Sequence, residues 1–193
     1  RPESVRTHEL AWEQYVGEWL RTSVSAYRST ASDLITFIEL DNEDFGFANQ
    51  DTVRAKGLEF EAELRSRSGM QVVASAAFQR SVDEHGDRLV NWPDNVAEIR
   101  GSVPGPWRGS TAAVEVHYVG ARQTLSKTWL PGFALAHAAF TAPLSRHFSL
   151  MASMRNVFNR RYFDPASAEH VQDSIEQYGR TARIDLRWDI TGR

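Results

Sequence analysis

The chain has 193 residues, no cysteine and a formal net charge of -3 at pH 7. This length suits one domain of ordinary size, and the small charge gives no general electrostatic argument for nucleic acid or anionic lipid as a partner. The lack of cysteine excludes a disulfide framework and a cysteine-ligated metal site. The longest apolar stretches, such as residues 72–78, are far shorter than the roughly 20 residues that a membrane helix needs.

Alternation of apolar and polar residues recurs along the chain and predicts β-strands. We predict about nine strands, in chain order at residues 5–15, 19–38, 58–65, 70–80, 95–103, 111–118, 133–142, 148–155 and 182–190. Several of them reach the roughly 9–11 residues of a tilted membrane strand, whereas a strand of a soluble protein usually has about 5–6. The fold class that we expect is all-β, an antiparallel transmembrane β-barrel.

The last of these strands shows the pattern most clearly. Ile184, Leu186 and Trp188 alternate with Arg183 and Arg187, so on a strand the two sets lie on opposite faces. A slip of one residue would turn the arginines toward hydrocarbon, which costs roughly 2–4 kcal/mol each at the midplane. The pattern therefore predicts that one face touches lipid while the charged face lines a wet lumen.

The connections between the predicted strands alternate strictly between short and long. Short turns are expected near residues 17–18, 66–69, 104–109 and 143–147, and longer polar loops near residues 39–51, 83–93, 122–131 and 159–178. Outer-membrane barrels have short periplasmic turns and long extracellular loops. Six aromatic residues lie near the predicted periplasmic ends, as an interfacial girdle requires: Trp12, Tyr15, Trp19, Trp107, Phe148 and Trp188. The alternative is that they form the core of a soluble β protein.

Several segments resemble, in order, motifs of the TonB-dependent receptors of the outer membrane. Residues 1–10 (RPESVRTHEL) resemble the opening "PE…T.E.G" strand of these receptors. Residues 33–35 (DLI), 47–49 (FAN) and 55–61 (AKGLEFE) together resemble their "dLI … N … GvElE" pattern. Residues 156–162 (NVFNRRY) resemble their "NLFdkrY" signature, and Gly179-Arg180 stands before the final strand. Each motif alone is loose, but their order and spacing together are specific.

The resemblance implies a barrel of about 22 strands with an N-terminal plug. Such a receptor takes up a scarce ligand, such as a ferric siderophore or cobalamin, across the outer membrane of a Gram-negative bacterium. Residues 1–190 would be the C-terminal segment of this barrel, about nine strands, and residues 191–193 a C-terminal extension. The expected partners are the lipid bilayer, the small-molecule ligand, the barrel-assembly machinery, and the TonB complex through an N-terminal region that this sequence lacks; nucleic acid is not expected.

Ligand capture, on this interpretation, belongs to the extracellular loops. Cations there could steer an anionic metal chelate, and aromatic rings could stack on it. The candidates are Trp92, Lys127, Trp129, Arg160, Arg161, Tyr162 and His170. The alternative is that these are solvated loop residues and girdle aromatics, and that Arg160, Arg161 and Tyr162 belong to a structural motif.

His117 and His137 would lie opposite each other on the lumen face if the hairpin between them is symmetric about Lys127. A two-histidine metal site is then conceivable, but two polar lumen residues without an ion are the simpler account, and we predict no metal site. Three acids on one face, Glu59, Glu61 and Glu63, fit lumen-lining residues beside Arg65.

We expect no enzyme and no cofactor, because no metalloprotease, nucleophile-elbow or P-loop motif occurs. Two other classes of protein remain open: a small self-closed outer-membrane barrel, porin-like or enzymatic, and a soluble β-sandwich binding module.

Overall fold

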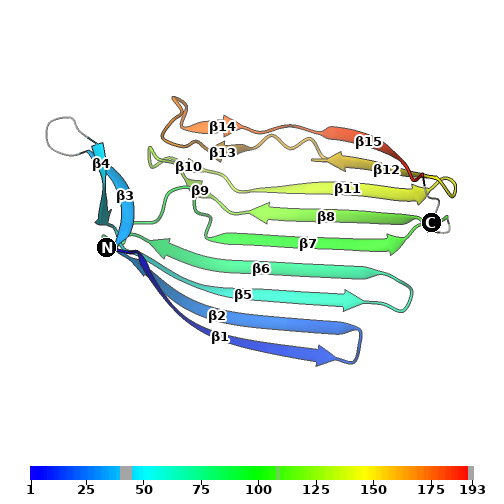
Figure 1. The fold of residues 1–193 in the computed structure, drawn as a ribbon, viewed down its shortest axis with the longest axis horizontal. Helices are drawn as coiled ribbons and strands as arrows, with labels where there is room; N and C mark the ends of the chain where they lie inside the picture. The colour runs from blue at the N-terminus through cyan, green and yellow to red at the C-terminus, as the bar shows by residue number, and fades with distance from the viewer. Residues whose placement is uncertain (40–44, 108, 191–193) are drawn as a thin grey trace.

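The computed structural model describes residues 1–39, 45–107 and 109–190. These residues form one large antiparallel sheet of nine strands, in the order β1-β2-β5-β6-β7-β8-β11-β12-β15 (Figure 1). The strands are β1 (Ser4–Val16), β2 (Leu20–Ser32), β5 (Val53–Arg65), β6 (Gln71–Val82), β7 (Asn95–Pro104), β8 (Thr111–Val119), β11 (Phe133–Pro143), β12 (Phe148–Arg155) and β15 (Thr181–Trp188). The predicted all-β antiparallel fold, with about nine strands in the main sheet, is confirmed.

The strand register gives the sheet two chemically different faces. Phe60 lies opposite Val24 and Ala76, and Leu186 lies opposite Leu150, so apolar side chains continue from strand to strand. What we call the apolar face includes Leu10, Val24, Leu58, Phe60, Phe78, Ile99, Val114, Val116, Phe140, Leu150, Ile184 and Leu186. What we call the polar face includes Glu13, Arg21, Glu61, Glu63, Ser75, Glu98, Arg100, Glu115, His117, His137, Ser153, Arg183 and Asp185.

No second layer of the described chain covers the apolar face. Ile184 is 76% exposed, Leu186 62% and Trp188 64%. A β-sandwich would bury such residues between its two sheets, so the sandwich interpretation is not favoured. The described residues also do not close into a small barrel, because β1 and β15 stand at the two ends of the sheet and each has one partner strand. The open sheet is consistent with part of a larger barrel.

Short and long connections alternate as predicted, and all the short ones lie at one end of the sheet, on the right in Figure 1. The long connections gather at the other end, where they contain three small two-stranded sheets. These pair β3 (Leu34–Glu39) with β4 (Phe45–Gln50), β9 (Arg122–Gln123) with β10 (Trp129–Leu130), and β13 (Phe163–Pro165) with β14 (Ser174–Glu176).

The single strand predicted over residues 19–38 is wrong. The chain leaves the large sheet at Asp33, which adopts a left-handed conformation (φ 57°), and continues as β3 in a separate hairpin. Asn49 holds this bend, because its side-chain amide donates a hydrogen bond of 2.7 Å to the Asp33 carbonyl. Alternation alone could not reveal the break, since it continues on both sides of Asp33. The predicted extension at residues 191–193 lies outside the described residues.

The predicted girdle aromatics lie at the short-turn end and are exposed. Trp12 is 58% exposed and Trp107 62%. Phe148 and Trp188, which face each other across β12 and β15, have stacked rings with centroids 6.2 Å apart. Exposed aromatic rings grouped at one end of a sheet are typical of a membrane interface. None of the described residues forms a helix that could cross a membrane.

Candidate functional site

An ion-pair network crosses three strands of the polar face near the short-turn end. Arg21 on β2 reaches Glu13 on β1 and also Glu61 on β5, whose carboxylate oxygen lies 2.5 Å from the guanidinium. Glu63 lies 4.0 Å from Arg21 and 2.6 Å from Arg65. Opposite charges on neighbouring strands stabilise the register. Glu61 and Glu63 therefore have cationic partners, as expected for lumen-lining acids.

A glycine on β5 makes room for an aromatic ring on the same face. Tyr27 lies opposite Gly57, and a β-carbon at Gly57 would come within 2.8 Å of the Tyr27 ring and 2.9 Å of the Phe78 carbonyl oxygen. The tyrosine hydroxyl reaches across β5 and donates a hydrogen bond of 3.1 Å to Gln79 on β6. The glycine of the "GvElE"-like motif thus has a packing role.

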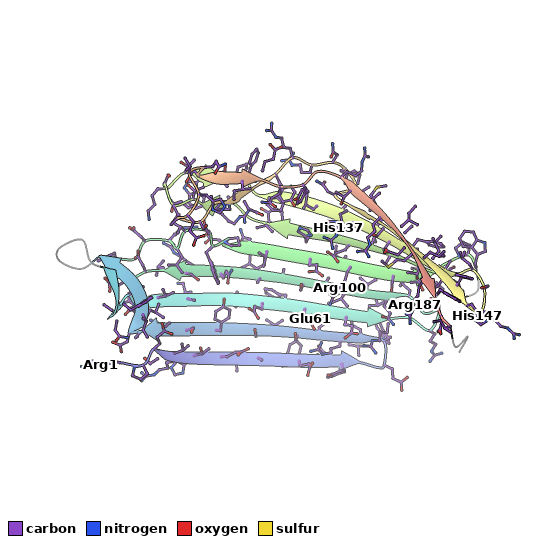
Figure 2. The ribbon with its side chains drawn as sticks, turned by 45° about the horizontal axis from the view of Figure 1, so that its top comes forward. Arg1, Glu61, Arg100, His137, His147 and Arg187 are labelled. Atoms are coloured by element: carbon purple, nitrogen blue, oxygen red, sulfur yellow. The ribbon has the colours of Figure 1, made fainter. Side chains whose placement is uncertain are left out.

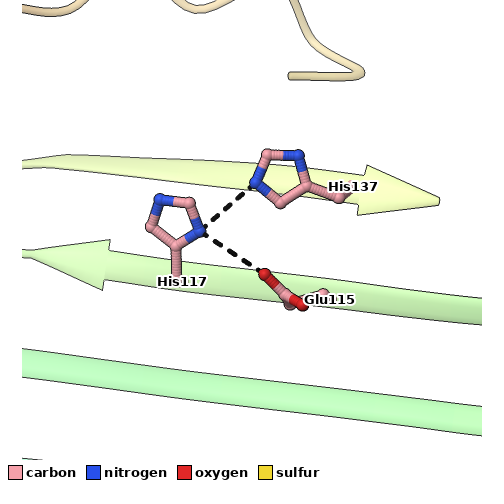
Figure 3. A group of neighbouring side chains, drawn as sticks. All are labelled: Glu115, His117 and His137. Atoms are coloured by element: carbon pink, nitrogen blue, oxygen red, sulfur yellow. Dashed lines mark hydrogen bonds and ion pairs between the residues drawn. The ribbon is translucent and has the colours of Figure 1, made fainter. Parts of the chain in front are cut away.

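Glu115, His117 and His137 form a compact cluster on the polar face (Figure 3). Nε2 of His137 lies 3.3 Å from Nδ1 of His117, and a carboxylate oxygen of Glu115 lies 3.9 Å from the same Nδ1. The predicted direct opposition of the two histidines is wrong. His137 pairs with Glu115 and His117 pairs with Leu135, because the hairpin is not symmetric about Lys127. The imidazoles meet diagonally instead, with ring centroids 5.1 Å apart.

His137 also anchors the point where the chain leaves β12. The backbone amide of Asn156 donates a hydrogen bond of 3.1 Å to Nδ1 of His137, while the next amide, Val157, bonds to the Ala136 carbonyl at 2.8 Å. Asn156 is therefore the extra residue of a β-bulge, with φ 49°. Its buried side chain accepts a bond of 2.7 Å from the Arg160 amide and donates one of 2.8 Å to the Arg160 carbonyl.

The long connections are tied together by Arg122, whose side chain is only 12% exposed. Its guanidinium donates to the carboxylate of Asp164 at 2.7 Å and to the Phe163 carbonyl at 3.1 Å. It also lies over the Phe133 ring, 5.4 Å from the centroid. A partly buried, charge-assisted contact of this kind is among the stronger hydrogen bonds in proteins. It joins the loop after β8 to the loop after β12.

A second link between the same loops is made by Asp173. Its carboxylate accepts hydrogen bonds from the Thr124 hydroxyl at 2.6 Å and from the Ser126 amide at 3.2 Å. These bonds, the one from Thr124 first, hold the pKa of Asp173 below its ordinary value because they stabilise the charged carboxylate. Thr124 is fully buried beneath the contact.

The structure places the seven predicted ligand residues at the long-connection end, in different environments. Trp92 and Trp129 are exposed by 47% and 50%, and the guanidinium of Arg88 lies over the Trp129 ring at 5.7 Å. Lys127 is exposed at the tip of the β9–β10 hairpin. His170 is exposed and lies 3.0 Å from the Ser167 hydroxyl. These four have side chains available to a ligand.

The other three candidates have structural partners. Arg161 makes a bidentate ion pair with Glu176, at 2.7 and 2.9 Å, and lowers the pKa of that carboxyl. The Tyr162 ring packs against Phe133, with centroids 4.5 Å apart. Arg160 is held through its backbone by Asn156. This supports the interpretation of these three residues as part of a structural motif.

Sequence reasoning missed the roles of Arg122 and Asp173, whose contacts span 42 and 49 positions of the chain, so no local pattern identifies them. Asn156 belongs to the quoted NVFNRRY motif, but its bond to His137, 19 positions away, was not foreseen. Glu115 could have been found as a neighbour of His117, because the two residues share one face of a strand.

A long antiparallel sheet with one exposed apolar face, one polar face and alternating turns and loops defines a wall of a membrane β-barrel. The family model described as "TonB dependent receptor-like, beta-barrel" matches residues 1–157. The chain therefore belongs to the TonB-dependent receptor β-barrel family, as its motifs predicted. No curated protein matches the chain.

Solved receptors share this fold. The chain is similar to the pyoverdine receptor FpvA of Pseudomonas aeruginosa (TM-score 0.78, 17% identity, 98% of this chain and 30% of that chain). It is also similar to the ferric-catecholate import receptor Fiu of E. coli (TM-score 0.76, 14% identity, covering 98% of this chain and 28% of that chain). For the ferric preacinetobactin receptor BauA of Acinetobacter baumannii the TM-score is 0.73, with 15% identity over 95% and 29% of the two chains. The chain spans less than a third of the length of these receptors.

Proposed function

We propose that the chain forms the C-terminal part of the barrel of a TonB-dependent receptor that imports a scarce ligand, such as a ferric siderophore or cobalamin, across the outer membrane. The observation that carries this proposal is the two-faced sheet with one unpaired edge at β1 and another at β15. In hydrocarbon each unpaired backbone group costs several kcal/mol, so both edges need further strands. Family membership and the 28–30% coverage of solved receptors support the same conclusion.

The class of ligand is supported by the relatives and by the loops. The receptors FpvA, Fiu and BauA are described as binding or importing ferric chelates, and another similar structure is that of the copper transporter OprC. Exposed aromatic rings and cations at the long-connection end, among them Trp92, Trp129 and Lys127, suit an anionic chelate with aromatic groups. TonB would act through a region outside this sequence, and the barrel-assembly machinery would insert the complete barrel.

Uptake of radioactive iron tests this function. Cells that make the complete receptor, with no other route for the same chelate, are given ferric catecholates, ferric hydroxamates and ferric pyoverdines in turn, and labelled cobalamin in parallel. We expect accumulation of at least one of them that depends on TonB. Failure of every probe, with the receptor present and folded in the membrane, contradicts the proposal.

The matched control is a cell that makes residues 1–193 alone. We expect no energy-dependent uptake in this case, because the two open edges prevent a closed pore. The isolated chain should also lack the shifted mobility of a closed barrel on an unboiled gel. Accumulation of ligand by this segment alone would show that it closes by itself and is a transporter of another kind.

A further inference from the structure

We propose that Glu115, His117 and His137 bind one divalent transition-metal cation, such as Zn²⁺ or Cu²⁺, on the polar face of the sheet. The proposal rests on the proposed function in one respect: this face must line a wet lumen that the ion can enter. Two imidazoles and one carboxylate suit Zn²⁺ or Cu²⁺ better than Mg²⁺ or Ca²⁺, which prefer oxygen ligands alone.

The spacing of the three side chains fits a single ion. Zinc binds imidazole nitrogen at about 2.0–2.1 Å, so two nitrogens on one tetrahedral ion lie about 3.3–3.4 Å apart. The observed separation between Nε2 of His137 and Nδ1 of His117 is 3.3 Å. A carboxylate oxygen of Glu115 completes the set, and all three ligand atoms lie within 4.8 Å of one another. Small side-chain rotations would bring them onto one ion.

The backbone beneath the cluster is fixed by the sheet. Glu115 and His117 stand two positions apart on β8, and His137 lies opposite Glu115 on β11. Sites on strands hold their ligands more precisely than sites on loops. Arg100, on the neighbouring strand β7 (Figure 2), pairs with Glu98 at 3.6 Å. The Glu115 carboxylate pairs with His117 instead, at 3.9 Å.

Metal binding must rearrange one hydrogen bond. A backbone amide can only donate, so the bond from Asn156 shows that Nδ1 of His137 carries no proton. A neutral His137 therefore has its proton on Nε2, from which it donates to Nδ1 of His117. To ligate a metal through Nε2, His137 must carry the proton on Nδ1 instead, and the Asn156 bond breaks. Metal binding is thus coupled to the bulge at the start of the 156–180 connection.

The test measures zinc bound to the complete receptor in detergent, after removal of metal with EDTA and dialysis against ZnCl₂. We expect the unaltered receptor to retain one equivalent of zinc more than the variants His117→Ala and Glu115→Gln. Both variants keep the His137–Asn156 bond, so they should fold normally. Their zinc affinity should fall by about tenfold or more, since loss of even an outer-shell partner has effects of this size.

The control variant is His85→Ala, which removes a histidine that lies 3.4 Å from Glu84 in an exposed loop; among the described residues these two belong to no three-ligand group. It should retain as much zinc as the unaltered receptor. Zinc should also speed hydrogen exchange of the Asn156 amide in the unaltered receptor and not in His117→Ala. Equal zinc in the unaltered receptor and His117→Ala would overturn the site, whereas zinc binding with unchanged exchange would overturn the coupling. Ligand uptake measured in parallel distinguishes failure of the site from failure of the proposed function.

Discussion

The backbone amide of Asn156 donates a hydrogen bond to Nδ1 of His137 at 3.1 Å. This contact joins the end of β12 to the middle of the neighbouring strand β11, at the bulge where the chain turns into its last long connection. Asn156 is buried, with 3% of its surface exposed, so its amide has little access to water as a replacement partner. The His137 side chain and the Val157–Ala136 backbone bond therefore both hold the chain where this connection begins.

Replacing His137 by Leu should release the bulge. The Asn156 amide would lose its acceptor, and an unsatisfied buried donor costs roughly 1–3 kcal/mol. His137→Asn is the matched control, because its side-chain oxygen can occupy the position of Nδ1. Hydrogen exchange at residues 155–160 should accelerate in the Leu variant and stay near the unaltered rate in the Asn variant. Equal acceleration in both would show that the imidazole acts through packing rather than through this bond.

A charge placed on the apolar face should be far more damaging than the same charge on the polar face. Ala152 and Ser153 are adjacent on β12, and the register puts Ala152 opposite Ile184 and Ser153 opposite Arg183. Ala152→Arg should lower the free energy of unfolding of the complete barrel by about 2–4 kcal/mol, while Ser153→Arg should lower it by less than about 1 kcal/mol, through repulsion from Arg183 on the neighbouring strand. Denaturant unfolding in lipid vesicles measures both. Similar losses in the two variants would contradict the assignment of the lipid-facing side.

The link between the long loops should weaken in acid. The pKa of Asp173 is lowered in the folded protein, so its charged form contributes stability at pH values above its ordinary pKa of 3.8, and this contribution is lost as the pH falls through the lowered value. Limited proteolysis at residues 124–130 should therefore speed up in the acid range. In Asp173→Asn the loops should be loose at neutral pH already, with a smaller change on acidification. An identical pH profile in the two proteins would exclude Asp173 as the cause.

Zinc affinity should rise when a nearby positive charge is removed. Arg155 lines the same hollow of the polar face as Glu115, His117 and His137. Its repulsion of a dication is screened by lumen water, so Arg155→Gln should strengthen zinc binding by only about two- to fivefold. Arg155→Lys keeps the charge and should bind zinc like the unaltered receptor. Titration calorimetry with ZnCl₂ compares the three proteins, and equal affinities would place Arg155 outside the electrostatic reach of the site.

Most of the sheet could be predicted from the sequence because its cause is local. A strand between lipid and water must alternate, as Ile184, Leu186 and Trp188 do with the arginines between them, and a single slip would turn those arginines into hydrocarbon. The alternation of turns and loops follows from the two different ends of such a barrel. Both the alternation within strands and the alternation of turns and loops can be read from residues that are close in sequence.

The contacts of the site depend on pairings that no local pattern contains. The β8–β11 hairpin is symmetric about Ser126 and not about Lys127. Only the folded sheet therefore shows that Glu115 faces His137 and that His117 meets His137 diagonally. Asp33 and Asn156 interrupt strands through left-handed backbone conformations, which side chains from distant segments hold in place. The sequence by itself thus determined which side of each strand meets lipid. The tertiary structure decided which side chains meet across strands and between loops, because that depends on register and on contacts between segments far apart in the chain.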